Sequence, residues 1–145
     1  MQTAPTSTFR YKQTSVPVFP THRRTKNVGN IWQDNWKNFG AKVYNQYADL
    51  IAYDGTILKS RNIIGAYKPE SKKRILLCAH WDSRPYADND PDPKNHHTPI
   101  LGVNDGASGV GVLLEIARQI QKEQPALGID IVFFRFGGLW NSRIL

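Results

Sequence analysis

The stretch Arg74-Ile75-Leu76-Leu77-Cys78-Ala79-His80 decides the fold class of this chain. A short, continuous apolar run that ends in a polar group is typical of a strand buried inside a sheet. A second run of this kind, Ile129-Asp130-Ile131-Val132-Phe133-Phe134, follows later in the sequence. Two buried strands of this composition indicate a sheet that is covered by other elements. Cys78 is then expected to be an inert small residue within the core.

The sequence between these two runs predicts a long polar loop and one amphipathic helix. Residues 81–104 are polar and rich in proline, and loops of this length are usually functional or disordered. A helix is predicted from Gly106 to about Glu123, with Asp105 as its N-cap. Strand, crossover helix and strand in this order predict a parallel pair and an α/β fold. The apolar positions of this helix recur at helical spacing: Val110, Leu113, Leu114, Ala117 and Ile120.

The first part of the chain predicts one further helix and a hairpin. Residues 1–30 show no periodicity and are interpreted as an irregular basic segment. Residues 31–39 place apolar side chains on one helical face, and Gly40 is a plausible helix end. Residues 41–53 and 56–67 read as two strands, and Asp54-Gly55 between them is a strong hairpin signal.

Length and composition limit the chain to one globular domain without a disulfide framework. It has 145 residues, 40% of them hydrophobic and 21% charged, with a single cysteine. No apolar run approaches the length of a membrane span. The net charge of +7 comes from the two ends, because residues 41–134 are balanced. We therefore expect no nucleic-acid partner, and a solvated basic tail explains the excess charge.

The residues that could carry chemistry gather around the end of the first buried run. His80 ends that strand and Asp105 precedes the predicted helix, so both are expected at the C-terminal edge of the sheet, where ligands bind in open α/β folds. An imidazole and a carboxylate in one crevice suit zinc, and Asp82 could orient the imidazole. A satisfied strand-end histidine and a plain helix cap explain the same residues without a metal, because two ligands do not make a zinc site.

The motifs around His80 and Asp105 resemble a known family. The strings His80-Trp81-Asp82-Ser83-Arg84-Pro85 and Gly102-Val103-Asn104-Asp105-Gly106-Ala107-Ser108-Gly109-Val110 are similar to the zinc aminopeptidase-like superfamily, peptidase family M28. Within it the chain resembles the bacterial glutaminyl-peptide cyclotransferases, over residues 37–134. The resemblance implies a mixed, mostly parallel sheet flanked by helices, with zinc at the C-terminal edge of the sheet. It also implies that residues 31–134 are the N-terminal part of such a domain.

The resemblance also implies an activity and a set of roles. Asp105 corresponds to a zinc ligand, and His80 to a second ligand in two-zinc aminopeptidases, while in single-zinc cyclases that position lines the site. The implied reaction converts the N-terminal glutamine of a peptide into pyroglutamate with release of ammonia. Zinc polarises the γ-carboxamide and a glutamate moves the proton. Members of the family are usually exported or lipid-anchored, so a location outside the cytoplasm is expected.

The last residues depart from the family pattern. After Phe134 the family continues with a string like Phe-Asp-x-Glu-Asp-x-Gly, which supplies the catalytic glutamate and a metal-binding carboxylate. Residues 135–145 instead read Arg-Phe-Gly-Gly-Leu-Trp-Asn-Ser-Arg-Ile-Leu. Their allowed codons, read in another frame, can restore this family string. The codons of Thr14–Thr21, read one frame away, can likewise give Asp-Phe-Gly-Pro-Arg-Val-Pro-Asn, the usual N-terminal string of the family. We therefore hypothesise that the ends are frameshifted, that 135–145 is an aberrant tail, and that this chain is inactive.

Two other functions remain open from the sequence. A zinc aminopeptidase of the same superfamily would use the same residues to activate water. A non-catalytic binding domain would keep the fold and have lost the metal. Measured products and zinc content separate these alternatives from a cyclase.

Overall fold

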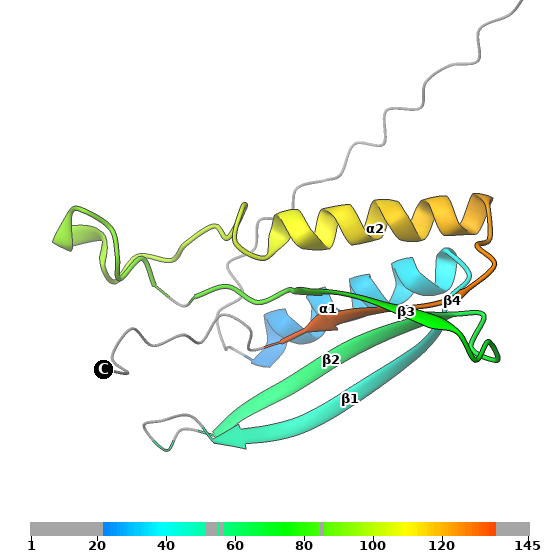
Figure 1. Ribbon diagram of the computed structural model, residues 1–145. Coiled ribbons are helices and arrows are strands. Elements are labelled where there is room, and N and C mark those ends of the chain that lie inside the picture. The colour runs from blue at the N-terminus through cyan, green and yellow to red at the C-terminus, as the bar shows by residue number, and fades with distance from the viewer. Residues whose placement is uncertain (1–21, 52–54, 56, 85, 136–145) are drawn as a thin grey trace, which may run out of the picture.

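The computed structural model describes residues 22–51, 55, 57–84 and 86–135, and side chains from residue 27 onward within these ranges. In these residues a four-stranded sheet carries two α-helices, and a 3-10 helix lies in the long loop (Figure 1). The elements in chain order are α1 (His22–Asn38), β1 (Lys42–Ile51), β2 (Ile57–Tyr67), β3 (Arg74–His80), η1 (Pro93–Asn95), α2 (Ala107–Lys122) and β4 (Gly128–Phe134).

The sheet is mixed and has the strand order β1-β2-β4-β3. β1 and β2 form the predicted antiparallel hairpin, with Asn45 opposite Ile63. The Asp54 half of the predicted turn lies outside the described residues. β4 pairs with β2 antiparallel and with β3 parallel, so that His80 lies opposite Phe134. The predicted parallel pair around the α2 crossover is confirmed, and it is the one parallel pair among the described strands.

Both helices cover the same face of the sheet, and the core lies between them and the strands (Figure 1). Trp36 of α1 is fully buried and meets the Phe133 ring edge-on, with 4.6 Å between the ring centroids. A Cβ atom at Gly65 would lie 1.7 Å from Trp36 Cε3, so glycine makes room for the indole. The buried positions of α2 are the five predicted from spacing: Val110, Leu113, Leu114, Ala117 and Ile120.

Helix α1 begins earlier than the sequence predicts. The predicted irregular segment, residues 1–30, is helical from His22 onward, and the predicted start at Ile31 lies inside the helix. A tertiary contact holds the helix around the predicted start. The buried Arg61 of β2 donates hydrogen bonds to Asn30 Oδ1 (3.0 Å) and Gln33 Oε1 (2.9 Å) of the helix. A long-range polar contact of this kind leaves no apolar period in the sequence.

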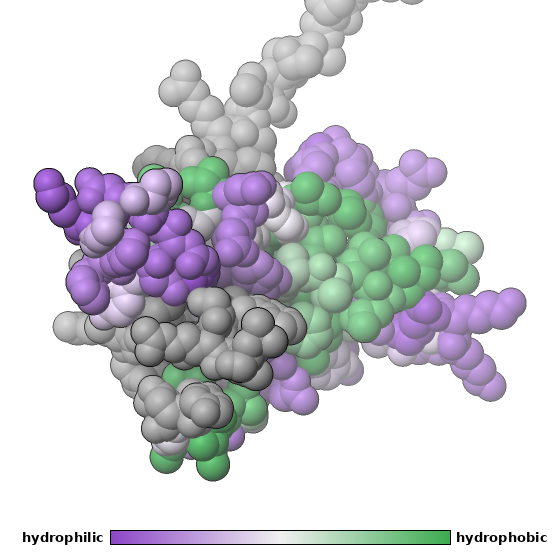
Figure 2. All heavy atoms as spheres, turned by 60° about the vertical axis from the view of Figure 1, so that its left-hand side comes forward, coloured by the Kyte–Doolittle hydropathy of each residue, from purple (hydrophilic) through white to green (hydrophobic). Residues whose placement is uncertain are grey.

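The interior position predicted for strand β3 is wrong for the described part of the chain, because β3 is an outer strand there. Leu76 is 61% exposed and Ile75 is 44% exposed. Cys78 is also exposed rather than buried in the core. An outer strand pairs on one side only, so its apolar side chains lack the cover that a central strand has. Figure 2 shows apolar side chains gathered at one face of the molecule between hydrophilic ones.

Among the described residues no helix has both the length and the apolar character that crossing a membrane requires.

Candidate functional site

His80 lies at the C-terminal end of β3, where the strand leaves the sheet. The register with β4 fixes its position, and the backbone N–H of the next residue, Trp81, still donates to Phe134 O (2.9 Å). The imidazole is partly exposed, with 29% of the side chain accessible. This is the sheet edge at which ligands bind in open α/β folds, as predicted.

Asp105 comes to the same edge from the turn that precedes α2. The prediction that Asp105 caps this helix is wrong: Gly106 is the N-cap, and within the described residues no side-chain hydrogen bond caps the helix. Gly106 has a φ of +94°, which favours glycine, and a Cβ there would lie 2.9 Å from Asp82 O and 3.1 Å from His80 Cε1. Glycine thus lets the turn approach the imidazole and leaves the Asp105 carboxylate free of a capping role.

The two predicted donors meet at hydrogen-bond distance. His80 Nε2 lies 3.0 Å from Asp105 Oδ1. On the other side of the ring, His80 Nδ1 lies 3.0 Å from the Asp82 carbonyl oxygen and 3.7 Å from its carboxylate Oδ1. A carbonyl oxygen can only accept, so we assign the proton to Nδ1. Nε2 then faces the carboxylate either as the second N–H of an imidazolium or as a lone pair.

Asp82 therefore orients His80, although mainly through its backbone rather than through the predicted carboxylate contact. Its side chain is 7% exposed. An N–H···O=C bond from Nδ1 fixes ring orientation and tautomer, which is the usual arrangement behind a histidine that binds a metal through Nε2. When the imidazole is neutral and Nε2 carries a lone pair, the site consequently presents one imidazole nitrogen and one carboxylate oxygen to the same point.

These donors fit zinc by type, but the described residues supply only two of them. Catalytic zinc sites hold three protein ligands. No group of three or more His, Cys, Asp or Glu side chains suited to a metal occurs within the described residues. The side chains outside the described ranges include only His22 and Asp54 of these types. The described donors alone do not complete a catalytic zinc site.

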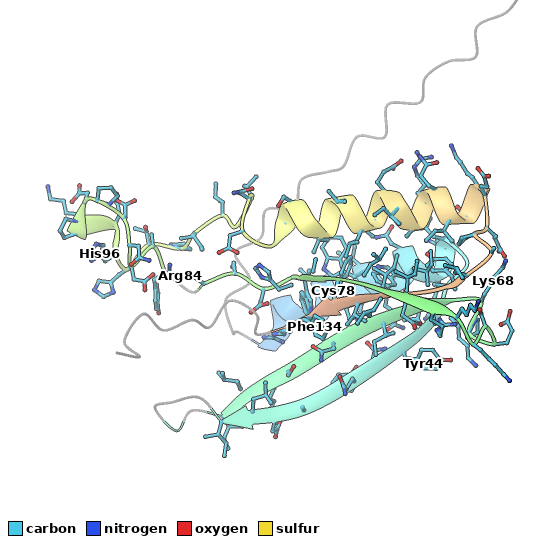
Figure 3. The ribbon with its side chains drawn as sticks, viewed as in Figure 1. Tyr44, Lys68, Cys78, Arg84, His96 and Phe134 are labelled. Atoms are coloured by element: carbon cyan, nitrogen blue, oxygen red, sulfur yellow. The ribbon has the colours of Figure 1, made fainter. Side chains whose placement is uncertain are left out.

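The remaining histidines of the loop do not join this site. His96 Nε2 lies 2.9 Å from the Asp90 carbonyl oxygen, and the His97 ring lies edge-on to Tyr86. Figure 3 shows His96 and Arg84 on the part of the loop that extends past the ends of the strands, far from Cys78 and Phe134. The structure thus brings His80, Asp82 and Asp105 together and leaves the two loop histidines elsewhere.

One residue near the site was missed by the sequence analysis, which assigned Arg135 to an aberrant tail. Its guanidinium carbon lies 5.6 Å from the centroid of the buried Trp81 ring. Burial lowers the pKa of Arg135, and the negative charge of Asp82 acts in the opposite direction. Tertiary packing, and not a local sequence motif, positions this guanidinium, so no sequence signal could have identified it.

Comparisons with known proteins show the family of this chain. The model of peptidase family M28 matches residues 62–137. The alkaline phosphatase isozyme conversion protein of Escherichia coli (strain K12) is 31% identical over 71 residues, which are 48% of this chain and 21% of that protein.

Two solved structures from Bacteroides thetaiotaomicron share the fold at high identity. Its glutaminyl cyclase bound to N-acetylhistamine has a TM-score of 0.86 and 60% identity, covering 92% of this chain and 46% of that one. A leucine aminopeptidase precursor has a TM-score of 0.81 and 65% identity, covering 85% of this chain and 42% of that one. The chain therefore spans less than half the length of each of these three relatives. With a family match over more than half its length, as its motifs predicted, this chain belongs to peptidase family M28.

Proposed function

We propose that this chain is the N-terminal part of a zinc-dependent glutaminyl-peptide cyclotransferase, which acts on the N-terminal glutamine of peptides. The observation that carries the proposal is the approach of His80 Nε2 to Asp105 Oδ1 at 3.0 Å, at the ligand-binding edge of the sheet. The similarity to glutaminyl cyclases supports it. The enzyme class is a transferase of the acyl group, by resemblance.

The proposed reaction sets the requirements for the site. The α-amino nitrogen attacks the γ-carboxamide carbon, a C–N bond forms, and the bond to the amide nitrogen breaks. One proton passes from the amine to the departing ammonia. The reaction needs a polarised carboxamide and a group that moves this proton.

The described residues meet these requirements only in part. His80 and Asp105 supply two metal donors, and the Asp82 carbonyl holds the imidazole in place. The buried Asp82 carboxylate interacts with Arg135, which leaves no carboxylate among the described residues of this edge that is suited to moving the substrate proton. We therefore expect the 145-residue chain to be inactive.

Ammonia release tests this expectation. The purified 145-residue chain is incubated with zinc and a glutaminyl peptide in a coupled assay, beside a blank that contains zinc alone. We expect no turnover above the blank. Turnover above it would show that the residues present suffice for the reaction and would contradict the expected inactivity.

A chimera tests the function itself. Residues 1–134 are joined to the part of the Bacteroides thetaiotaomicron glutaminyl cyclase that follows the matched region. We expect the chimera to convert glutaminyl peptides to pyroglutamate, and Asp105→Asn to lower turnover at least about 100-fold, since loss of an outer partner of a metal ligand already costs about 10–100-fold. Asp88→Asn, in the exposed ion pair with Arg84, is the matched control and should not change turnover.

An aminopeptidase is the second candidate, because a leucine aminopeptidase precursor is similar to this chain as well. The same chimera, and a second one built on that precursor, are offered leucyl and glutaminyl peptides. Free leucine without pyroglutamate from both chimeras would refute the cyclase proposal. Absence of zinc from both chimeras by elemental analysis would instead favour a non-catalytic binding domain.

A further inference from the structure

We infer that the positively charged guanidinium of Arg135 neutralises the carboxylate of Asp82. It thereby lowers the affinity of the neighbouring His80–Asp105 pair for a divalent metal. The inference rests on the proposed function, because it concerns the same metal donors. It adds a residue whose charge opposes the metal, in a segment that the motifs of the family do not explain.

The position of Arg135 is fixed through its backbone. Its N–H donates to Asn62 Oδ1 (3.1 Å), and its carbonyl oxygen accepts from Ser60 Oγ (3.3 Å). Both partners belong to β2, so the residue that follows β4 continues alongside the sheet. The side chain therefore starts from a defined point next to the end of β3, where His80 lies.

An aromatic platform holds the guanidinium itself. Its carbon lies 5.6 Å from the centroid of the Trp81 ring, a distance at which a cation interacts with the ring face. Trp81 is 5% exposed, and its indole N–H donates to the carbonyl oxygen of Arg61 (3.3 Å). A ring that is itself fixed restricts the guanidinium to this edge of the sheet.

The guanidinium and the Asp82 carboxylate interact electrostatically. The negative charge of Asp82 favours the charged form of Arg135, while burial disfavours it. Asp82 Oδ1 in turn lies 3.7 Å from His80 Nδ1. The charge of one carboxylate thus acts on both the guanidinium and the imidazole.

The charge balance of the site follows from these neighbours. Asp82 and Asp105 would give the edge two negative charges and attract a dication, but Arg135 neutralises one of them. A unit positive charge near a dication opposes its binding by Coulomb repulsion, which for partly screened charges at a protein surface changes the affinity by about tenfold. Removing the guanidinium charge should therefore tighten metal binding by this factor.

Zinc titration of the purified 145-residue chain tests the inference, with isothermal calorimetry as the readout and zinc chloride as the probe. Arg135→Gln removes the charge, and Arg135→Met removes it while keeping an unbranched chain to pack on Trp81. Arg135→Lys keeps the charge. Arg118→Gln, on α2 in an ion pair with Glu115, is the matched control for loss of one positive charge. Far-UV circular dichroism verifies that each variant is folded.

We expect zinc to bind about tenfold more tightly to the Gln or Met variant, with the Lys variant and the Arg118 control within about threefold of the parent. Equal affinities for the parent and a folded neutral variant would overturn the inference, as would an equal gain in the Arg118 control. Asp105→Asn separates the two proposals. If it abolishes zinc binding while Arg135 has no effect, the metal site stands and the inference fails; if zinc binding survives it, the metal lies elsewhere and both fail.

Discussion

The close approach of Gly65 to Trp36 predicts a large cost for adding one methyl group. In Gly65→Ala the new Cβ would lie 1.7 Å from Trp36 Cε3 and 2.3 Å from Cζ3, far inside van der Waals contact. The indole is fully buried and packs against Phe133 at 4.6 Å, so it has little room to move away. Overpacking of a dense core costs about 1–3 kcal/mol, and a clash this deep belongs at the upper end of that range.

The intrinsic preference of a strand for alanine over glycine returns about 0.5 kcal/mol, so the net loss in unfolding free energy is about 2–3 kcal/mol. Urea denaturation followed by circular dichroism measures it, and the midpoint should fall by about 1–2 M for a domain of this size. Gly111→Ala is the matched control. Apart from the backbone of its own helix, no atom of the described residues lies within 4 Å of a Cβ there, and the helix should gain about 1 kcal/mol.

A double variant localises the effect. With Trp36→Leu in the background the clash is gone, so Gly65→Ala should cost much less than it does in the parent chain. A Gly65→Ala midpoint equal to that of the parent would refute the reasoning. An equal cost in both backgrounds would show that the loss does not come from the indole.

Two further predictions concern ionisable groups. The Tyr67 hydroxyl is buried without a hydrogen-bond partner among the described residues, and burial raises its pKa to about 12. Tyr67→Phe should therefore stabilise the fold by about 1 kcal/mol at neutral pH. The parent should lose stability relative to this variant as the pH rises from about 10 to 12, because the folded state holds the proton more tightly; equal thermal midpoints throughout would contradict this. Hydrogen bonds from Arg118 and Gln119 lower the pKa of Glu115 to about 2. The folded carboxyl binds its proton less tightly than the unfolded one, so its contribution is present above about pH 4.5 and lost toward pH 2. Glu115→Gln should lower the thermal midpoint at neutral pH and match the parent near pH 2; a difference that persists there would count against the ion pair as its cause.

Local patterns predicted the parts of this fold that local patterns determine. The spacing of Val110 and Leu113 identified the core face of α2, because apolar residues at helical spacing form the stripe of the helix that packs against the core. The run that begins at Ile75 correctly indicated a strand, but it did not indicate which strands lie beside that strand in the sheet. An apolar run reports that a strand suits an interior position, whereas exposure depends on which strands lie beside it.

Non-local contacts explain what the sequence missed. Arg61 holds α1 around the predicted start through the amide oxygens of Asn30 and Gln33, and such polar contacts leave no apolar stripe in the sequence. Asp105 illustrates the same limit at the site. A carboxylate before a helix is usually a cap, and only its distance of 3.0 Å from His80 Nε2, reached over a Gly106 turn of positive φ, shows that it meets His80 instead. The motif resemblance identified both donors, while the spacing alone left the cap and the ligand as alternatives.

The half-site formed by His80 and Asp105 is already organised, and this decides what completing it requires. The β3–β4 register places His80, the Asp82 carbonyl orients its ring, and the Gly106 turn brings Asp105 to 3.0 Å. Additional residues therefore need to supply donors, not to reshape these two. Of the side chains that the structure does not describe, only those of His22 and Asp54 are ordinary zinc ligands. If the chimera gains activity, the gain should thus come from carboxylate and histidine ligands contributed by its second half, with the His80–Asp105 geometry unchanged.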